Sequence, residues 1–260
     1  MIRLTYVTIT YNASAVLQRT LDSVMAQDYP EIMHLIIDGA STDETLLMVE
    51  RYIERSNKAG NGHSVQLMSE PDEGIYDAMN KGLRSLTGDY VCFLNAGDFL
   101  PAADTASRIA AAVQAEGEAQ CMPAVLYGDT DIVDGEGHFL HHRRLAPPER
   151  LTWKSFRQGM LVCHQAFYAR TDFAIATPYD TQYRYSADVD WCIRVMKAAA
   201  KEDVPMKNLH MIVANYTEEG QTTLHHRESL WERYRVMERH YGRVQTFLLH
   251  CWFVVRTAFT

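Results

Sequence analysis

Acidic side chains follow apolar runs of the chain at several points where a run gives way to a turn. Three of them, Asp38, Asp72 and Asp98, come after the runs at 33–37, 65–68 and 90–94. If these runs are parallel strands, their carboxyl ends meet at one sheet edge, and open α/β sheets bind ligands in the cleft outside that edge. Clustered carboxylates repel an anion unless a divalent cation screens them. The pattern therefore predicts a cleft for a divalent metal and an anionic ligand such as a nucleoside diphosphate.

Asp98 is the predicted metal ligand. Gly97 permits a sharp turn that would aim Asp98 into the cleft. A hard oxygen ligand that keeps water and diphosphate as further ligands suits Mn²⁺ or Mg²⁺. Position favours Asp98, because it shares the strand edge with Asp38. The Asp-x-Asp spacing alone decides nothing, since it also occurs at Asp129/Asp131 and Asp188/Asp190.

Five residues near these strand ends are predicted to bind the nucleoside-diphosphate ligand. Tyr11 can stack on a nucleobase, and Thr10 lies beside it, although Thr10 could simply terminate the strand through a hydrogen bond. Asp38 could accept the ring N–H of uracil. Asp72 lies in a loop that leaves a strand, and Lys81 could offset the pyrophosphate charge. The alternative for Lys81 is an exposed helical lysine.

Two acids and a histidine of the second half are candidates for the chemical step and the sugar or acceptor site. Asp188 begins a helical pattern, where it could cap the helix or act as the general base that takes a proton from an attacking hydroxyl. Asp190 is the second choice for this role. His164 could bind sugar or phosphate, or pack beneath the site.

The periodicity of the first half predicts an α/β fold with a mostly parallel central sheet flanked by helices. Short runs rich in β-branched residues predict buried parallel strands. Helical patterns separate them, as in right-handed βαβ units. The predicted strands are 4–9, 33–37, 65–68 and 90–94, and the predicted helices are 16–25, 43–56 with Ser41 or Thr42 as N-cap, and 75–86.

The second half continues the pattern without a linker, a repeat or a low-complexity segment. We therefore predict one domain over 1–223, with a donor-nucleotide half at 1–100 and an acceptor half at 101–223. The predicted elements are helices at 103–116, near 149–157 and at 188–200, a strand pair at 124–133 and 138–145, and an apolar strand after Gln165.

The segment 224–260 is predicted to be a helical extension. Helical spacing over 224–241 is broken by Gly242, and eight of the nine residues from Phe247 to Val255 are apolar. This run is too short to span a bilayer but suits a helix in the membrane interface. Packing on the core or on a second subunit, as in a homodimer, is the alternative.

Composition limits the partners and the compartment. The net charge of −8 argues against a nucleic-acid partner, because phosphate binding needs a basic face. Five scattered cysteines suggest buried thiols in a reducing compartment. We find no secretory signal pattern and no spanning run, so the expectation is a cytoplasmic protein, with peripheral contact to the inner face of the membrane as a further option.

Taken together, these segments resemble inverting family 2 glycosyltransferases of the GT-A fold, most closely bacterial enzymes that extend surface polysaccharides. The likeness covers about half of the chain, from about 4 to 100 and from 160 to 194. Its motifs are Tyr11, Asp38, the Glu-Pro-Asp-Glu-Gly-Ile-Tyr-Asp-Ala-Met-Asn-Lys-Gly run at 70–82 and the Asn95…Asp98 turn.

The resemblance implies a nucleoside-diphosphate sugar donor, with UDP favoured, and a divalent metal at Asp98. It also implies a base at Asp188 and transfer with inversion to a hydroxyl of a glycan or lipid-linked acceptor, which would give a β product from an α-linked donor. Many members carry paired acids at the metal turn, where this chain has Gly97 and Asp98. The ribose contact is therefore assigned to Asn95.

A nucleotidyltransferase and a non-catalytic subunit are the two alternative functions. A nucleotidyltransferase should carry a glycine-rich basic loop near its amino terminus, and residues 8–20 contain no glycine. A non-catalytic sugar-nucleotide-binding or scaffold subunit is the remaining alternative, because donor-binding residues can persist without turnover.

Overall fold

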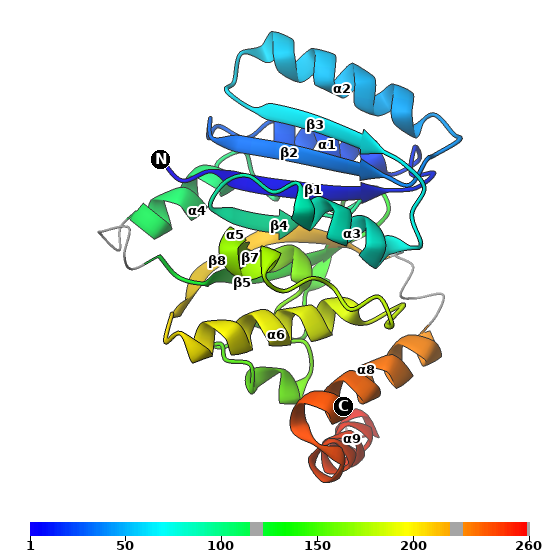
Figure 1. Cartoon of the computed structure of the whole chain (residues 1–260), viewed down its shortest axis with the longest axis vertical. Coiled ribbons are helices and arrows are strands. Elements are labelled where there is room, and N and C mark those ends of the chain that lie inside the picture. Colours follow the sequence, from blue (N-terminus) through cyan, green and yellow to red (C-terminus); the bar gives the residue numbers. More distant parts are fainter. Residues whose placement is uncertain (115–121, 219–225, 259–260) are drawn as a thin grey trace.

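The computed structural model describes residues 1–114, 122–218 and 226–258. Within them, the strands form an eight-stranded sheet with the order β3-β2-β1-β4-β7-β5-β6, and β8 pairs with β5 outside this path (Figure 1). The first half of the chain contributes four parallel strands, β1 (Leu4–Thr10), β2 (Ile32–Asp38), β3 (Ser64–Ser69) and β4 (Tyr90–Phe93).

The second half of the sheet mixes both strand directions. β7 (Phe167–Arg170) runs antiparallel to β4 and to β5 (Val125–Val133). β8 (Met206–Thr217) runs parallel to β5, and the short β6 (Phe139–His142) is antiparallel to it. β4, β5 and β8 thus point the same way, so the end of β8 lies at the same sheet edge as the ends of the first four strands.

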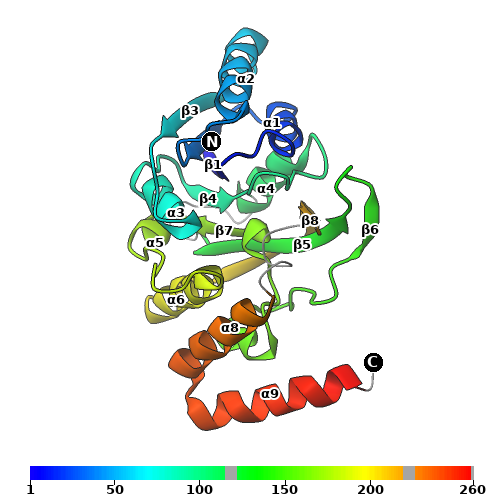
Figure 2. The ribbon, with the colours of Figure 1, turned by 90° about the vertical axis from the view of Figure 1, so that its right-hand side faces the viewer.

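Helices cover both faces of the sheet. In Figure 2, α3, α5 and α6 lie on one side, and α1 and α4 lie on the other. α1 and α2 share a small apolar core with β2, to which Leu21, Ile36 and Tyr52 contribute. The helices are α1 (Leu17–Met25), α2 (Thr45–Ala59), α3 (Ile75–Arg84), α4 (Thr105–Gln114), α5 (Thr171–Ile175), α6 (Ala187–Lys201), α8 (His226–Tyr241) and α9 (Arg243–Ala258), with 3₁₀ turns η2 (Ser155–Gln158) and η3 (His164–Ala166).

One large apolar core joins the two halves of the chain and extends into α8. Buried side chains from β1 through α6 belong to it, and Val236, Met237 and Tyr241 of α8 complete it. None of the helices within the described ranges has the length and apolar composition that crossing a membrane requires. The predicted division at 223 and 224 therefore falls between elements that share a core, and the domain boundary stays a prediction.

Most predicted elements of the first half are confirmed to within a few residues. Strong periodicity explains this, because each strand is short, apolar and followed by an amphipathic helix. β3 differs from the prediction of a buried strand: as the edge strand beside β2, it alternates between exposed and half-buried residues. The predicted N-cap of the second helix is also wrong, because α2 begins at Thr45 and Ser41 has another partner, described below.

The predictions for the second half were less accurate. The prediction of a helix near 149–157 is wrong, since only η2 is helical there. The backbone before η2 bonds to a side chain instead: the Leu151 N–H donates to the hydroxyl of Tyr127, which in turn donates to Glu149 O. β8 was not predicted, because its pairing with β5 is irregular and His210 has a positive φ of 50°. Three cysteines are buried thiols as predicted, but Cys251 is exposed; Cys121 lies outside the described residues.

Close packing of α3 on β1 depends on Gly82. A Cβ atom there would lie 2.8 Å from Val7 Cγ1, below the distance that real contacts allow. Gly82→Ala improves helix propensity by about 1 kcal/mol, but overpacking a rigid core costs about 1–3 kcal/mol. We expect the steric term to win, so urea unfolding should show a lower free energy of unfolding.

A double-mutant cycle controls for this effect. In a Val7→Ala background the missing methyl groups leave room for the new Cβ, so Gly82→Ala should become neutral or stabilising. A Gly82→Ala variant that is more stable than the wild type on its own would contradict the close approach of α3 and β1.

Candidate active site

Asp98 sits in a tight turn directly after β4. Gly97 adopts a φ of +99°, in the left-handed region that glycine tolerates, and the Asp98 N–H donates to Asn95 O at 3.0 Å. The Asp98 carboxylate accepts hydrogen bonds from Gln165 Nε2 at 2.7 Å and from the Thr217 N–H at 3.0 Å. The sharp turn predicted at Gly97 is therefore present, and it brings Asp98 against η3 and the end of β8.

Burial raises the pKa of Asp98 to about 6, and the hydrogen bonds from Thr217 and Gln165 offset this only in part. The side chain is 5% exposed. Relative to an ordinary value of 3.8, folding makes the ionised carboxylate costlier by about 3 kcal/mol. A cation bound beside Asp98 would remove that cost.

Asp188 lies in the first turn of α6 and accepts bonds from two other elements. The Tyr76 hydroxyl, from α3, lies 3.2 Å from Oδ1, and His164 Nδ1 lies 3.3 Å from Oδ2. Burial would raise the pKa of Asp188, but the hydrogen bond and any positive charge of His164, then the charge of Arg233, hold it below its usual value. Asp188 is therefore an ionised carboxylate at neutral pH.

The two carboxylates share one site because their partners are consecutive residues. His164 contacts Asp188, and Gln165 contacts Asp98. Asn95 Nδ2 lies 3.0 Å from His164 Nε2 and extends this chain of contacts back to β4. The Nδ1 of His164 faces a carboxylate, which only accepts, so Nδ1 carries the proton. Asn95 Oδ1 is buried and has no hydrogen-bond partner within the described residues.

Asp190 is not brought to this cluster. Successive helical positions are about 100° apart, so Asp188 and Asp190 lie on opposite sides of the first turn of α6. Asp190 is fully buried against α8, where it pairs with Arg194 Nε at 2.6 Å and with His240 Nε2 at 2.7 Å. This placement gives Asp190 a structural role between α6 and α8, and its role as the alternative base stays a prediction.

Asp38 ends β2 as predicted, but its carboxylate is fully buried and already bonded. It accepts from Thr10 Oγ1 at 3.0 Å, from Ser69 Oγ at 2.8 Å, and from both the N–H and the hydroxyl of Ser41. These bonds fix the loop between β2 and α2 to the ends of β1 and β3. A direct contact between Asp38 and a uracil ring stays a prediction.

Tyr11 and Asp72 flank Gly39, so the ends of β1, β2 and β3 converge there. A Cβ atom on Gly39 would collide with Asp72 Oδ2 and lie 3.3 Å from the Tyr11 ring. Tyr11 is 67% exposed, which leaves one aromatic face open. Two non-glycine residues beside it have positive φ, Asn12 at 48° and Ala40 at 60°, and such strain clusters at functional sites.

Lys81 is buried in α3, so the alternative of an exposed helical lysine is wrong. Its Nζ donates to Pro71 O at 2.6 Å and pairs with Glu70 at 3.2 Å and Asp77 at 3.5 Å. These three partners match the three donors of an ammonium group. Lys81 holds the loop that carries Asp72, and its direct contact to pyrophosphate stays a prediction.

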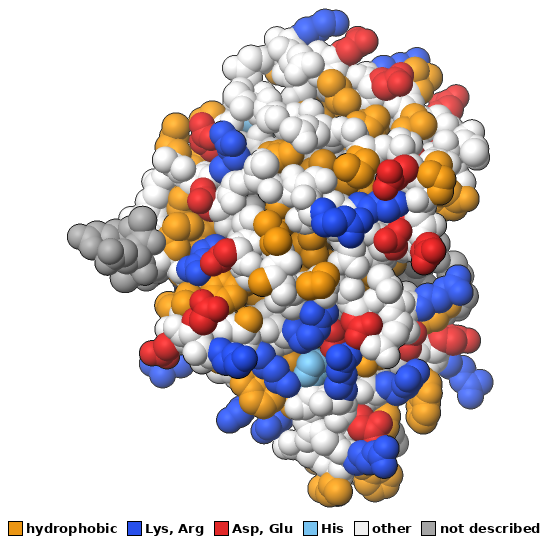
Figure 3. Space-filling model, in the orientation of Figure 1, with side chains coloured by type: hydrophobic (Ala, Val, Ile, Leu, Met, Phe, Trp, Pro, Cys, Tyr) orange, Lys and Arg blue, Asp and Glu red, His pale blue; other side chains and the backbone are white. Residues whose placement is uncertain are grey.

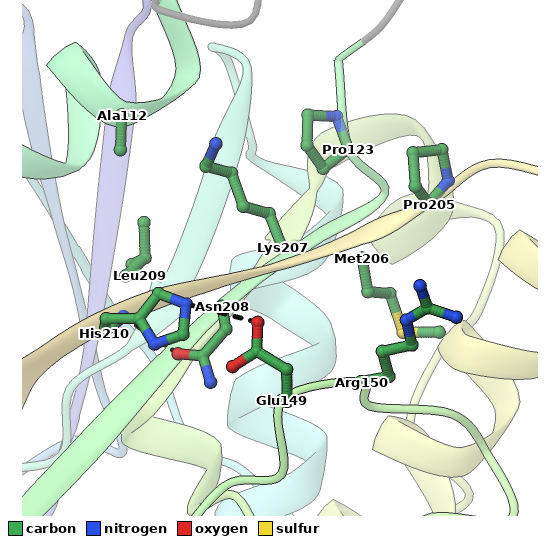
Figure 4. A pocket seen from close by; sticks show the side chains of 10 residues that line it. All are labelled: Ala112, Pro123, Glu149, Arg150, Pro205, Met206, Lys207, Asn208, Leu209 and His210. Atoms are coloured by element: carbon green, nitrogen blue, oxygen red, sulfur yellow. Dashed lines mark hydrogen bonds and ion pairs between the residues drawn. The ribbon is translucent and has the colours of Figure 1, made fainter.

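Among the described residues, a cavity near the sheet adjoins the Asp98 turn. Its volume is about 540 Å³, and Gly97, Thr217 and Arg19 line it. A second cavity, of about 460 Å³ (Figure 4), lies where β5 and β8 begin, at the opposite sheet edge. His210 and Glu149 form an ion pair of 3.6 Å there. That second cavity is therefore separate from the carboxylate cluster.

The geometry agrees with the sequence relationships of the chain. A sequence profile described as glycosyl transferase family 2 matches residues 5–175. The chain belongs to this family. It is 34% identical, over 212 residues, to a PGL/p-HBAD biosynthesis glycosyltransferase of Mycobacterium bovis, a match that covers 81% of this chain and 75% of the relative. The protein is therefore a glycosyltransferase rather than a scaffold subunit or a nucleotidyltransferase.

Solved structures show that the fold is GT-A. A fragment of S. aureus TarS in complex with UDP-GlcNAc matches with a TM-score of 0.68 at 19% identity, over 91% of this chain and 65% of that one. The mannosyltransferase PcManGT of Pyrobaculum calidifontis, in complex with GDP-Man and Mn²⁺, matches with a TM-score of 0.61 at 19% identity, over 92% and 64%. At such identities the likeness shows the fold alone.

Three residues that contact the acids of this glycosyltransferase were missed. Gln165 and Thr217 bond to Asp98, and Tyr76 bonds to Asp188. Tyr76 lies within the recognised run at 70–82, and Gln165 adjoins the predicted His164, so a signal for both was present. Thr217 uses its backbone N–H, which leaves no trace in the residue type.

The residues present fit a divalent cation that takes part of its coordination from its ligand. Within the described ranges, no three His, Cys, Asp or Glu side chains gather as a metal cage. Asp98 nevertheless offers a desolvated carboxylate, and Asn95 a buried oxygen without a partner. Mg²⁺ is commonly held by one or two carboxylates together with substrate phosphates and water. The donor set therefore suits a metal that arrives with a diphosphate.

The burial of Asp98 predicts a gain in stability when its charge is removed. Its folded pKa of about 6 exceeds the ordinary 3.8, so the cost of ionisation is fully present above pH 6 and disappears below pH 3.8. Asp98→Asn should therefore remove a cost of about 3 kcal/mol at pH 7.5. It also replaces one oxygen that accepts from Gln165 or Thr217 with an N–H₂ group, which costs about 1–3 kcal/mol at every pH. Urea unfolding with a chelator present would measure this.

The pH dependence separates the charge from a change in packing. At pH 4.5 the removed cost of ionisation should shrink to about 1 kcal/mol, because Asp98 is then mostly protonated in the folded state. Glu50→Gln, which neutralises an exposed acid of α2, should leave stability unchanged at both pH values. An Asp98→Asn variant whose stability relative to the wild type is the same at pH 4.5 and at pH 7.5 would contradict the cost assigned to this carboxylate.

Proposed function

We propose that this glycosyltransferase is a metal-dependent inverting enzyme. It moves a sugar from a nucleoside-diphosphate sugar, with UDP as the favoured nucleotide, to a hydroxyl of a glycan or lipid-linked acceptor. The observation that carries the proposal is the meeting of Asp98 and Asp188 around His164 and Gln165. Asp98 has a raised pKa, and a bound cation would stabilise its charge. Asp188 is ionised and can accept a proton.

The donor site is assigned to the converging ends of β1, β2 and β3. Tyr11 offers an exposed ring for base stacking, and Asp72 lies beside it across Gly39. Thr10, Asp38 and Lys81 then act mainly by holding the loops in place. The similar TarS and PcManGT structures are complexes with UDP-GlcNAc and GDP-Man, which supports a nucleotide-sugar donor here.

Asp98 is assigned to hold the metal, with Asn95 as a further oxygen ligand or as the ribose contact. When bound, Mn²⁺ or Mg²⁺ would supply charge neutralisation for the diphosphate leaving group. The Mn²⁺ in the PcManGT complex supports this assignment. On the protein side, the peptide N–H of Thr217 and the amide of Gln165 hold the Asp98 carboxylate in a fixed orientation.

Asp188 is assigned as the general base. It takes the proton of the acceptor hydroxyl as the oxygen forms a bond to the anomeric carbon, and the bond from that carbon to the diphosphate breaks with its electron pair on the diphosphate. Attack from the face opposite the leaving group inverts the configuration. A carboxylate of low pKa is a weak base, so proton transfer accompanies bond formation rather than preceding it. Tyr76 and His164 fix the carboxylate for this step.

Donor and metal dependence can be tested together by thermal shift. Nucleotide sugars screened with Mn²⁺, Mg²⁺ or chelator should stabilise the protein only when the metal is present, by about 2–3 kcal/mol at a hundredfold excess over the dissociation constant. Asp98→Asn should lose the metal-dependent part. Equal stabilisation with chelator would contradict a metal-dependent donor site.

The base can be tested by separating binding from turnover. Asp188→Asn should lower kcat for transfer by at least about a hundredfold, the range of a lost general base, while donor affinity stays within about twofold. Radiolabelled transfer and donor titration would measure the two.

Tyr76→Phe is the matched comparison, since it keeps the carboxylate and removes one hydrogen bond. It should lower kcat by roughly tenfold or less, a loss of one hydrogen bond. Asp190→Asn is expected instead to lower stability, because it leaves His240 and Arg194 without their partner. Normal turnover by Asp188→Asn would dismiss the assignment.

A further inference from the structure

Over the part of α9 whose side chains are described, 243–253, one face is packed against the molecule. α9 contacts η2 and α8. Thr246 is fully buried, Leu249 and Phe253 pack against the core, and the His250 ring lies 4.8 Å from the ring of Tyr234. Their spacing of three and four marks a single helical face. This inner face already accounts for the attachment of α9 to the rest of the molecule.

A second apolar stripe runs along the outer face of α9 and is exposed in the described part of the chain. Val244 is 76% exposed, Phe247 59%, Leu248 62% and Trp252 59%, and Cys251 is exposed between them. These positions also follow a spacing of three and four, so they form one continuous strip on the side away from α8. Large apolar side chains that gather in this way mark an interaction surface rather than chance exposure.

The charge around this stripe has the opposite sign to that of the remaining chain. Residues 226–258 contain six arginines and three glutamates, a net charge of +3, whereas the rest of the chain carries 19 basic and 30 acidic residues, a net charge of −11. No acidic residue occurs between 239 and 258. In Figure 3, Lys and Arg side chains gather over the end of the molecule that holds α8 and α9.

The acids of α8 are largely occupied. Glu232 accepts the backbone N–H groups of Arg184, Tyr185 and Ser186, and Glu238 pairs with Arg243. Arg235 and Arg243 are themselves exposed. The segment that carries the stripe is therefore net positive, whereas the molecule as a whole is negative.

We propose that the outer face of α9 docks on an anionic lipid surface, with Val244, Phe247, Leu248 and Trp252 in the headgroup region. An apolar stripe on a net-positive helix that lacks the length and apolar composition to cross a bilayer is typical of an interfacial helix. Anionic headgroups attract each nearby arginine. The proposal does not depend on the identity of the donor or the metal.

A second copy of the chain fits this face less well. A two-fold dimer places the same patch on both partners. Two segments of net positive charge would then face each other, and Glu238, the acid nearest the stripe, already pairs with Arg243 of its own chain. An anionic membrane supplies the missing countercharge.

Vesicle sedimentation tests the docking directly. The full chain should sediment with vesicles of equal parts phosphatidylcholine and phosphatidylglycerol, much less with phosphatidylcholine alone, and less at high salt. Leu248→Ser with Trp252→Ser should weaken binding by at least about tenfold, because two large side chains leave the interface. Arg243→Gln should weaken binding to the anionic vesicles by roughly fivefold.

The matched control removes two exposed apolar side chains elsewhere. Leu47→Ser on α2 with Ile175→Ser on α5 should bind vesicles like the wild type, since neither residue lies near α9. Donor binding by thermal shift should be the same in all variants. This readout keeps a failure of docking distinct from a failure of the proposed enzyme function.

Two results would overturn the proposal. The first is a wild-type protein that ignores both vesicle types at low salt while it still binds donor. The second is a dimer, seen by analytical ultracentrifugation without lipid, that Leu248→Ser with Trp252→Ser dissociates while vesicle binding is absent. In the second case the stripe is an interface between two copies of the chain.

Discussion

The burial of Asp98 is the constraint around which the site is arranged. An ionised carboxylate that costs about 3 kcal/mol consumes a large part of the 5–15 kcal/mol that stabilises a typical domain. The fold tolerates this cost because the Thr217 N–H and Gln165 fix the carboxylate from two separate elements. A site held in this way is already oriented for a cation. Metal binding would therefore offset the cost of the buried Asp98 charge instead of ordering a loop.

The donor half uses its charged residues differently. Asp38 and Lys81 look like ligand contacts in the sequence, yet both are buried and bonded to their own neighbours. Their hydrogen bonds fix the loops that carry Tyr11 and Asp72, whose side chains reach solvent or lie close to it. Charge at a strand end can thus serve a binding site through loop geometry as well as through contact.

The sequence predicted most strands and helices of the first half and the sheet edge on which the site lies. It did not predict the strand pairing of β8 or the side-chain contacts that complete the site. The four strands of the first half have strong periodicity, and their order along the chain brings Asp38 and Asp98 to one edge. β8 was not predicted as a strand, because its pairing with β5 is irregular. Asp190 is the second choice after Asp188 in the sequence, since both begin the same helix. The side that each faces depends on α8, which joins the core from far along the sequence.

The attachment of α8 links the outer surface of the molecule to the proposed base. Glu232 accepts three consecutive backbone N–H groups just before α6 begins, and Arg233 lies close enough to lower the pKa of Asp188. On the other side, α8 carries α9 through the contact of Tyr234 with His250. A helix pair that both lies on a bilayer and fixes the first turn of α6 would hold Asp188 at a set distance from the lipid surface. Such a geometry favours an acceptor hydroxyl carried by a lipid over one that diffuses freely, because the acceptor then needs to search only two dimensions.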